Sequence, residues 1–170
     1  MIGRPQPTEA DPYYFTYIDQ APGEDPLALL QTQLDQLAIA FSAISEAKSL
    51  HRYAPGKWSI RQVLNHLSDT ERSFAFRAFW FARGFDSPLP SFDQNIAATG
   101  AEADRLPWSA HREEFQRVRL ATISLFEGLP SAAWSRSGIA SEKRFTVRAI
   151  AFLTAGHVAH HFRILQERYL

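Results

Sequence analysis

The sequence contains no cysteine, and this absence excludes disulfide bridges, thiolate zinc sites and a cysteine nucleophile together. It also has no excess of charge of either sign, because 18 Lys and Arg residues balance 18 Asp and Glu residues. A chain without net charge is poorly suited to neutralising a phosphate backbone. We therefore expect no nucleic acid partner.

Long apolar runs are missing as well. No stretch approaches the roughly 18 apolar residues that a transmembrane helix needs, so we expect no membrane partner. Residues 1–25 lack the apolar centre of a secretory signal, which makes a cytoplasmic location the expectation. Neither a glycine-rich phosphate loop nor a G-x-S-x-G motif occurs, so nucleotide-dependent and serine-hydrolase chemistry have no support.

The composition is that of a globular protein, with 45% hydrophobic and 13% aromatic residues, and 170 residues fit one domain. Residues 1–25 are rich in proline and show no clear period. We expect them to form an extended N-terminal arm whose aromatic side chains pack onto the domain. The domain itself is expected to span residues 26–170.

Four segments carry apolar residues at three- and four-residue spacing, which predicts four amphipathic helices. Typical N-cap residues precede them, and at Ser59 a capping box is completed by Gln62. No segment predicts a convincing strand, and residues 131–145 are expected to be irregular, with a turn or a short extended piece. The prediction is an all-α fold, an antiparallel four-helix bundle. Three of the helices are expected to follow Asp25, Ser59 and Thr146, and the third in order is expected to follow Trp108, with Ser109 or a nearby residue as its cap.

Residues 85–108 form a long connection between the second and third predicted helices. A connection of this length in a compact domain is commonly functional or crosses the end of the structure. Asp93, Gln94 and Asn95 within it are typical turn residues, although they could also reach toward a site between the helices.

Three of the six histidines lie within five residues on the last predicted helix. At about 100° per residue, His157 and His161 lie about 40° apart on the buried stripe, whereas His160 falls outside it. This spacing lets two imidazoles bind one ion. The alternative is a pair of core histidines, each satisfied by a hydrogen bond.

A third ligand would have to come from another helix. His66 lies at the flank of the apolar stripe of the second predicted helix, with Thr70, Ser73 and Arg77 on the same flank. A flank suits a pocket between helices better than the dry centre does. Three imidazoles with an open position are typical of a catalytic metal site, whereas a structural site is closed.

The stretches "PGKWSIRQVLNHLSDTER" and "FTVRAIAFLTAGHVAHHFRILQ" resemble the DinB/YfiT-like family of metal-binding four-helix bundles, over roughly residues 27–170. The resemblance implies an up-down-down-up bundle with a long crossover between the second and third helices, often as a homodimer. It also implies a divalent metal such as nickel, zinc or iron, held by His66, His157 and His161. Substrate choice is then expected to depend on the 85–108 connection.

Three further residues near the histidines have two readings each. Asp69 could orient His66, but an ordinary salt bridge is the preferred interpretation. Glu71 points toward the apolar stripe and is expected to pair with an arginine from another helix, rather than to act as a base. Trp58 is expected to pack as a hydrophobic staple and not to stack on a ligand.

The first hypothesis is a metal-dependent enzyme of this family, a hydrolase or a transferase acting on a small molecule. A bound ion could lower the pKa of water or stabilise the thiolate of a low-molecular-weight thiol. The family includes thiol S-transferases, and this chemistry is the more informative hypothesis. The alternatives are a non-catalytic metal-binding or stress-response module and a plain helical dimerisation domain.

Overall fold

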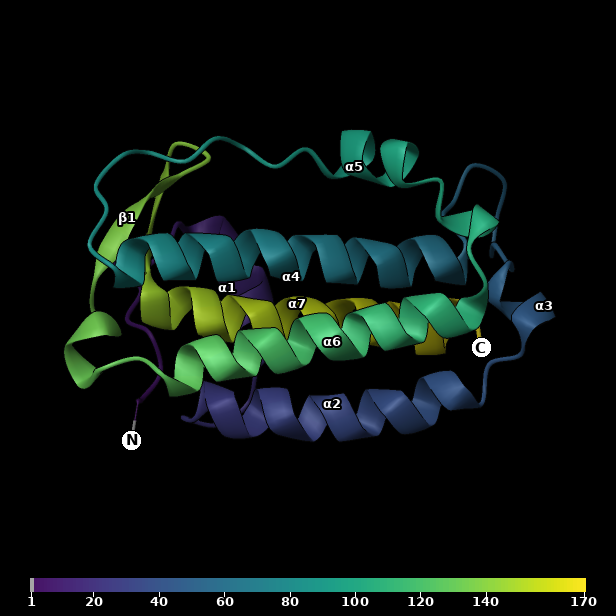
Figure 1. Cartoon of the computed structure of the whole chain (residues 1–170), viewed down its shortest axis with the longest axis horizontal. Helices are drawn as coiled ribbons and strands as arrows, with labels where there is room; N and C mark the ends of the chain where they lie inside the picture. Colours follow the sequence, from purple (N-terminus) through teal and green to yellow (C-terminus); the bar gives the residue numbers. More distant parts are fainter. Residues whose placement is uncertain (1) are drawn as a thin grey trace.

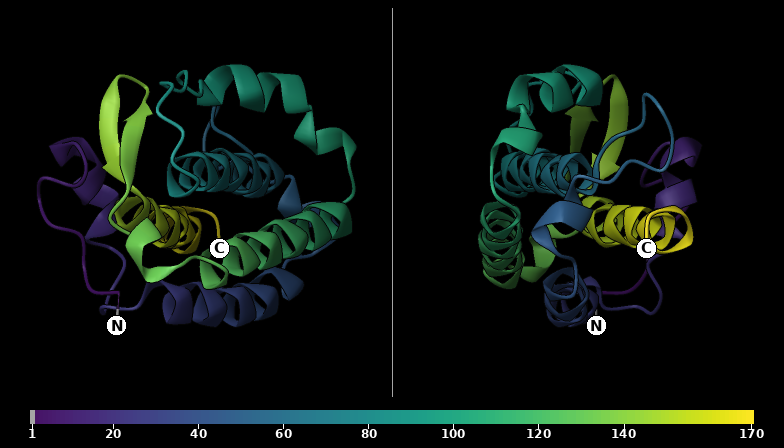
Figure 2. Two further views of the ribbon diagram at one scale, coloured as in Figure 1. Left: turned by 60° about the vertical axis from the view of Figure 1, so that its left-hand side comes forward. Right: turned by 90° about the vertical axis from the view of Figure 1, so that its right-hand side faces the viewer.

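Four long helices form a bundle in the computed structural model, which describes residues 2–170 (Figure 1). They are α2 (Pro26–Ser42), α4 (Ile60–Ala82), α6 (Trp108–Glu127) and α7 (Val147–Arg168). Both α4 and α2 pack against α6 and α7, which gives the square arrangement seen nearly end-on in Figure 2. The expected helical bundle is confirmed. Among residues 2–170, none of the helices combines the length and the apolar character needed to cross a membrane.

Three of these helices begin where their capping residues predict. The side chains of Asp25, Ser59 and Thr146 each accept hydrogen bonds from backbone N–H groups of the following first turn. The expected cap of α6 by Ser109 is wrong. This helix begins at Trp108, and its backbone N–H donates to the carboxylate of Glu46, 3.0 Å away in α3 (Glu46–Ser49). The capping group is therefore supplied by a segment distant in sequence.

A small sheet accompanies the helices, although no segment of the sequence predicted a convincing strand. Strands β1 (Ser137–Ala140) and β2 (Lys143–Thr146) pair in an antiparallel hairpin that leads into α7. The hairpin falls where a short extended piece was expected, but four residues are too few to display a clear alternating pattern. Its turn places Ser141 and Glu142 at φ 52° and 61°, in the left-handed region.

The N-terminal arm is not extended throughout, because residues Pro12–Ile18 form the short helix α1. Asp11 caps it and Pro12 takes the first helical position, the same signal that starts α2. Helix α1 packs against α7 at Gly156, where an added Cβ would lie 2.0 Å from the backbone oxygen of Tyr17. Glycine is thus required for this close approach. The division of the chain at residue 25 stays a prediction.

The long crossover after α4 runs back along the bundle before α6 begins (Figure 1). It contains α5 (Gln94–Ala101) and a 3₁₀ turn, η1 (Ala103–Arg105), so it is more ordered than an irregular connection. The Asp93 side chain accepts hydrogen bonds from the N–H groups of Asn95 and Ile96 and caps α5. These residues were expected to favour a turn, and an N-cap uses the same side-chain chemistry.

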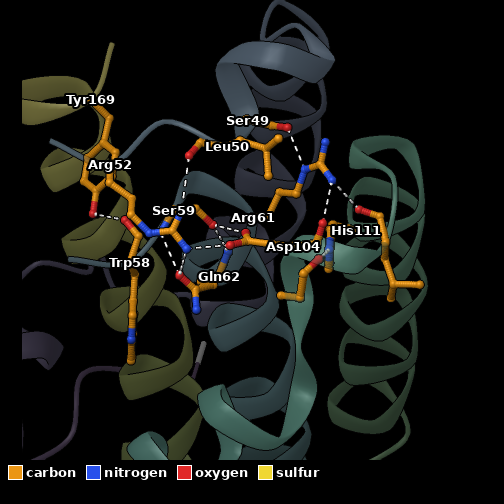
Figure 3. A network of polar contacts seen from close by, with 12 residues as sticks. Ser49, Leu50, Arg52, Trp58, Ser59, Arg61, Gln62, Asp104, His111 and Tyr169 are labelled. Carbon is orange, nitrogen blue, oxygen red and sulfur yellow. Dashed lines mark hydrogen bonds and ion pairs between the residues drawn. The ribbon is translucent and has the colours of Figure 1, made fainter. Parts of the chain in front are cut away.

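A polar network fastens the start of α4 to the end of the crossover (Figure 3). The carboxylate of Asp104 in η1 accepts hydrogen bonds from Ser59 and Arg52. The guanidinium of Arg61 donates to the backbone oxygens of Asp104 and Leu106, at 3.1 and 2.7 Å. The first turn of α4, two turns before His66, is therefore held from outside the bundle.

A second network crosses the core and touches all four long helices. Arg119 of α6 donates to both oxygens of Glu71 on α4, at 2.8 and 2.7 Å, and to the side-chain oxygen of Gln33 on α2 at 3.0 Å. Gln33 donates in turn to the backbone oxygen of Ala155 on α7, at 2.8 Å. Glu71 and Arg119 are both buried. The expectation that Glu71 pairs with an arginine from another helix is confirmed.

Candidate metal centre

Three histidine side chains converge between α4 and α7. His66 comes from α4, whereas His157 and His161 come from α7, and one ring nitrogen from each lies within 4.8 Å of the others. The Nε2 atoms of His66 and His157 are 3.2 Å apart. The structure thus brings together the three residues that the sequence singled out.

Local sequence explains how these rings meet. His157 and His161 are four residues apart, so their rings lie one above the other on one face of α7, with centroids 4.6 Å apart. The capping box fixes the start of α4 two turns before His66, and α4 packs along α7. The centroid of the His66 ring lies 5.0 Å from that of His157 and 4.9 Å from that of His161.

Burial keeps these imidazoles neutral. His66 and His157 are 3% and 7% exposed, and His161 is half-buried. Burial lowers the pKa of His66 to about 4, and burial followed by the nearby His66 and His160 lowers the pKa of His161 to about 3. The pKa of His157 is held well below its usual value, first by burial and then by the neighbouring histidines. Neutral imidazole is the form that binds metals.

The spacing of the nitrogens fits a shared ion. Bonds of 2.0–2.1 Å from zinc to two imidazole nitrogens in tetrahedral geometry separate those nitrogens by about 3.3 Å. The Nε2 atoms of His66 and His157 are already close to this separation. A hydrogen bond between these two rings would also explain their separation, but it would not explain why a nitrogen of His161 lies beside them. The donor set therefore fits a divalent cation.

The partner of the second His66 nitrogen is Thr70, whose Oγ1 lies 3.3 Å from Nδ1. Asp69 instead accepts a hydrogen bond from Arg72, at 3.1 Å. The preferred interpretation of Asp69 as a salt-bridge residue is confirmed. The sequence placed Thr70 on the flank of His66 but gave it no role. Its position four residues later, one turn along the helix, was the available signal.

Aromatic rings pack against two of the three histidines. The ring of Trp58 lies 4.9 Å from that of His66, so this residue packs on the histidine cluster in addition to its place at the helix start. Phe74 and Tyr17 contact His157, with centroids 5.9 and 5.6 Å away. Burial, followed by the adjacent Tyr13, raises the pKa of Tyr17 to about 12, so its phenol stays protonated at neutral pH.

The remaining histidines lie outside the cluster. His160 lies against α1 and the residues that follow it: its ring packs on Tyr17, and its Nδ1 is 3.3 Å from the side-chain nitrogen of Gln20. His111 is fully buried, with Nε2 2.8 Å from the backbone oxygen of Ala103, and His51 is exposed. The expectation that His160 would fall off the buried stripe is confirmed.

A cavity of about 380 Å³ adjoins the cluster and includes His66 and His157 in its wall. Its wall is built from α1, α4, α7, the start of α5 and the turn of the β-hairpin. Asp93, Gln94 and Asn95 line it, so the less favoured interpretation, that they reach toward the site, holds together with the turn chemistry. The tyrosines Tyr13, Tyr14 and Tyr17 form a wall that the sequence did not indicate.

A helical bundle with a buried three-histidine cluster between two of its helices defines the class of protein. A model of the DinB superfamily matches residues 29–165, and the chain belongs to this superfamily. The resemblance noted in the sequence is therefore confirmed. No curated protein sequence matches the chain significantly.

Solved structures share the fold at low sequence identity. YfiT from Bacillus subtilis, described as a probable metal-dependent hydrolase with an unusual four-helix bundle topology, matches with a TM-score of 0.71 and 17% identity, over 96% of this chain and 90% of its own. A mycothiol-dependent maleylpyruvate isomerase matches with a TM-score of 0.69 and 13% identity, over 89% of this chain. This chain covers 62% of the isomerase, which is the longer protein. A mutant form of the same isomerase gives a TM-score of 0.68 at 14% identity, over 85% of this chain and 61% of its own.

Proposed function

We propose that His66, His157 and His161 hold one divalent metal ion, and that the chain is a metal-dependent thiol S-transferase or hydrolase. The observation that carries the proposal is the junction of a neutral three-nitrogen donor set with a cavity of about 380 Å³. Zinc, nickel and iron all suit such a set. A non-catalytic metal-binding or stress-response module is the alternative, and the adjoining cavity favours the enzyme.

The ion would supply positive charge that stabilises a hydroxide or a thiolate at neutral pH. With the ion on Nε2, the Nδ1–H group of His66 would donate a hydrogen bond to the hydroxyl oxygen of Thr70, which would fix the orientation of that ring. The rings of Trp58 and Phe74 pack against His66 and His157 and would limit the movement of these two rings. Tyr17 is a protonated phenol in the cavity wall, suited to donating a hydrogen bond to a substrate oxygen.

Two neighbours in fold support the choice of reactions. One is described as a probable metal-dependent hydrolase and the other as a mycothiol-dependent isomerase. A low-molecular-weight thiol is accordingly the proposed co-substrate. We also propose an up-down-down-up order of the helices, supported by the crossover that runs back along the bundle (Figure 1). A homodimer and a cytoplasmic location stay predictions from the sequence.

Elemental analysis of the purified chain tests the ligand set. We expect about one divalent ion per chain, loss of the ion in His157→Ala, and retention in His160→Ala, the matched control three residues away. Equal loss from both variants would contradict the assignment. Assays of the metal-loaded protein with small thiols and electrophiles, and separately with ester and amide substrates, then distinguish transferase from hydrolase. Inactivity in both would favour the non-catalytic module.

A further inference from the structure

Arg77 lies in the wall of the cavity at a distance from the histidines. His66, Thr70, Phe74 and Arg77 recur at three- and four-residue steps on one face of α4, and all four line the cavity. The backbone rises by about 16 Å over the 11 residues from His66 to Arg77. Arg77 therefore lies three turns along the same wall, away from the proposed metal.

This arginine is buried without a counterion. Three arginines of the described chain are almost fully buried, and two of them pair with a carboxylate: Arg61 with Glu46 and Arg119 with Glu71. Arg77 is 6% exposed, and no acidic side chain among residues 2–170 forms an ion pair with it. A buried cation without a partner carries a large desolvation penalty. Its position in a cavity wall suggests that the counterion comes with a ligand.

Only one nitrogen of the Arg77 guanidinium makes hydrogen bonds within the described chain. Its Nη2 donates to the backbone oxygen of Pro90 at 3.3 Å and to the side-chain oxygen of Ser141 at 3.0 Å. Within the part of the chain that the structure describes, Nε and Nη1 of Arg77 make no hydrogen bond. Neither of these nitrogens is among the polar atoms that lack both a hydrogen-bond partner and contact with solvent. These two nitrogens are thus unpaired and retain some accessible surface. Burial lowers the pKa of Arg77, as expected for a cation that lacks a compensating charge.

We propose that Arg77 binds the carboxylate of an organic substrate whose other end reaches the histidine cluster. This inference rests on the proposed function for the reacting end of the substrate, but not for the contact at Arg77. The planar fork of a guanidinium matches a carboxylate with two parallel hydrogen bonds. The carboxylate belongs either to the electrophile or to the thiol, and the two sources share this chemistry.

The other side chains of the cavity favour a carboxylate over a phosphate. Arg77 is the one cationic side chain in the described wall, and the carboxylate of Asp93 lines the same cavity. A doubly charged phosphate would meet too little positive charge there. Aromatic and apolar side chains cover much of the remaining wall and suit an apolar body. These are Tyr13, Tyr14, Tyr17, Phe74, Phe92 and Leu153.

Matched acid and amide probes test the contact on the full chain. Calorimetry would compare 3-phenylpropionate with 3-phenylpropionamide, and N-acetylcysteine with its amide, on metal-loaded and on chelator-treated protein. We expect the acid of at least one pair to bind about tenfold or more tightly than its amide, since two parallel charge-assisted hydrogen bonds together differ from neutral ones by about this factor. Arg77→Gln should abolish that preference, whereas Arg83→Gln, at the exposed end of α4, should retain it.

The pattern across the probes identifies the source of the carboxylate. A preference within the phenylpropionate pair assigns it to the electrophile, and one confined to the N-acetylcysteine pair assigns it to the thiol. Equal binding of acid and amide in both pairs, or a preference that survives in Arg77→Gln, would overturn the proposal. Should Arg77→Gln fail to fold, the Nε–H resonance of Arg77 in the unaltered protein must shift with the acid and not with the amide.

Metal analysis separates this inference from the proposed function. Arg77→Gln should keep the metal content of the parent protein, because it lies three turns from the nearest proposed ligand. If the parent protein binds no metal, the proposed function fails, whereas the acid preference in chelator-treated protein still decides the role of Arg77. A structural role alone predicts a lower melting temperature for Arg77→Gln and equal binding of acid and amide by the parent protein. A ligand-binding role predicts tighter binding of the acid by the parent protein, whatever the melting temperature of the variant.

Discussion

The buried pair of Glu71 and Arg119 offers the sharpest test of how the bundle is held together. In Glu71→Gln the side chain keeps its size, but the charge opposite Arg119 is lost and an amide N–H group faces a guanidinium N–H. Both side chains are at most 1% exposed, so water cannot replace the missing carboxylate. Breaking a buried ion pair by altering one partner destabilises proteins by about 3–5 kcal/mol.

The contacts of the pair lead to the same magnitude. Two hydrogen bonds of 2.8 and 2.7 Å join the side chains, and bonds to charged groups contribute about 1.5–3 kcal/mol each. Arg119 keeps its bond to the side-chain oxygen of Gln33, so the lower half of the resulting range is expected. A domain of this size has a stability of about 5–15 kcal/mol, so Glu71→Gln removes a large share of it.

Urea unfolding followed by circular dichroism measures the effect. Glu113→Gln is the matched control, because Glu113 pairs with Arg117 on the surface and should change stability by less than about 1 kcal/mol. The double variant Glu71→Leu with Arg119→Met should recover most of the loss, because no unpaired charge remains in the core. A loss of stability below about 1 kcal/mol in Glu71→Gln would refute the reasoning. So would a double variant whose loss of stability equals the sum of the losses in Glu71→Leu and in Arg119→Met.

Three further outcomes are expected. The metal-free protein should lose stability as the pH falls from about 6.5 to about 4, because the histidines of the unfolded chain bind protons in this range and the buried histidines do not. His66 alone accounts for about 3 kcal/mol of this loss. A urea concentration at the unfolding midpoint that does not change over this pH range would contradict the burial of the cluster. Gly156→Ala should displace α1 from α7 by about 1 Å or more and destabilise the protein by about 1–3 kcal/mol. Limited proteolysis should then cleave the N-terminal arm faster than in the parent protein. An unchanged cleavage rate would show that α1 does not pack against α7 at this position. Asp104→Asn should lower the free energy of unfolding by about 1 kcal/mol, because a partly exposed carboxylate loses its ion pair with Arg52. Thermal unfolding measures the effect, with Arg105→Gln as the exposed control. Equal melting temperatures for the two variants would show that the network does not contribute to stability.

The features that the sequence predicted are local and periodic. The caps at Ser59 and Thr146 depend on residues three positions away, so they need no knowledge of the rest of the chain. The pairing of His157 with His161 follows from helical geometry alone, and the flank position of His66 follows from the same period. Their meeting needed only the packing of α4 along α7, which a four-helix bundle supplies.

The features that the sequence missed depend on contacts between distant segments. The N–H of Trp108 is capped by Glu46, 62 positions away, and no local pattern encodes such a pair. The flank position of Arg77 was visible, but that this arginine has no counterion is known only once every acidic side chain is placed. Helix α1 carries a clear start signal at Asp11 and Pro12, which the proline content of the arm concealed.

The close contact of α1 with Gly156 bears on how the protein should be produced. The family match spans residues 29–165, whereas the three tyrosines of the cavity wall lie upstream of it. A fragment trimmed to the family boundaries would retain all three clustered histidines and could pass every metal assay. It would nevertheless lack one side of the chamber, so a failed substrate screen on that fragment would say nothing about the intact chain.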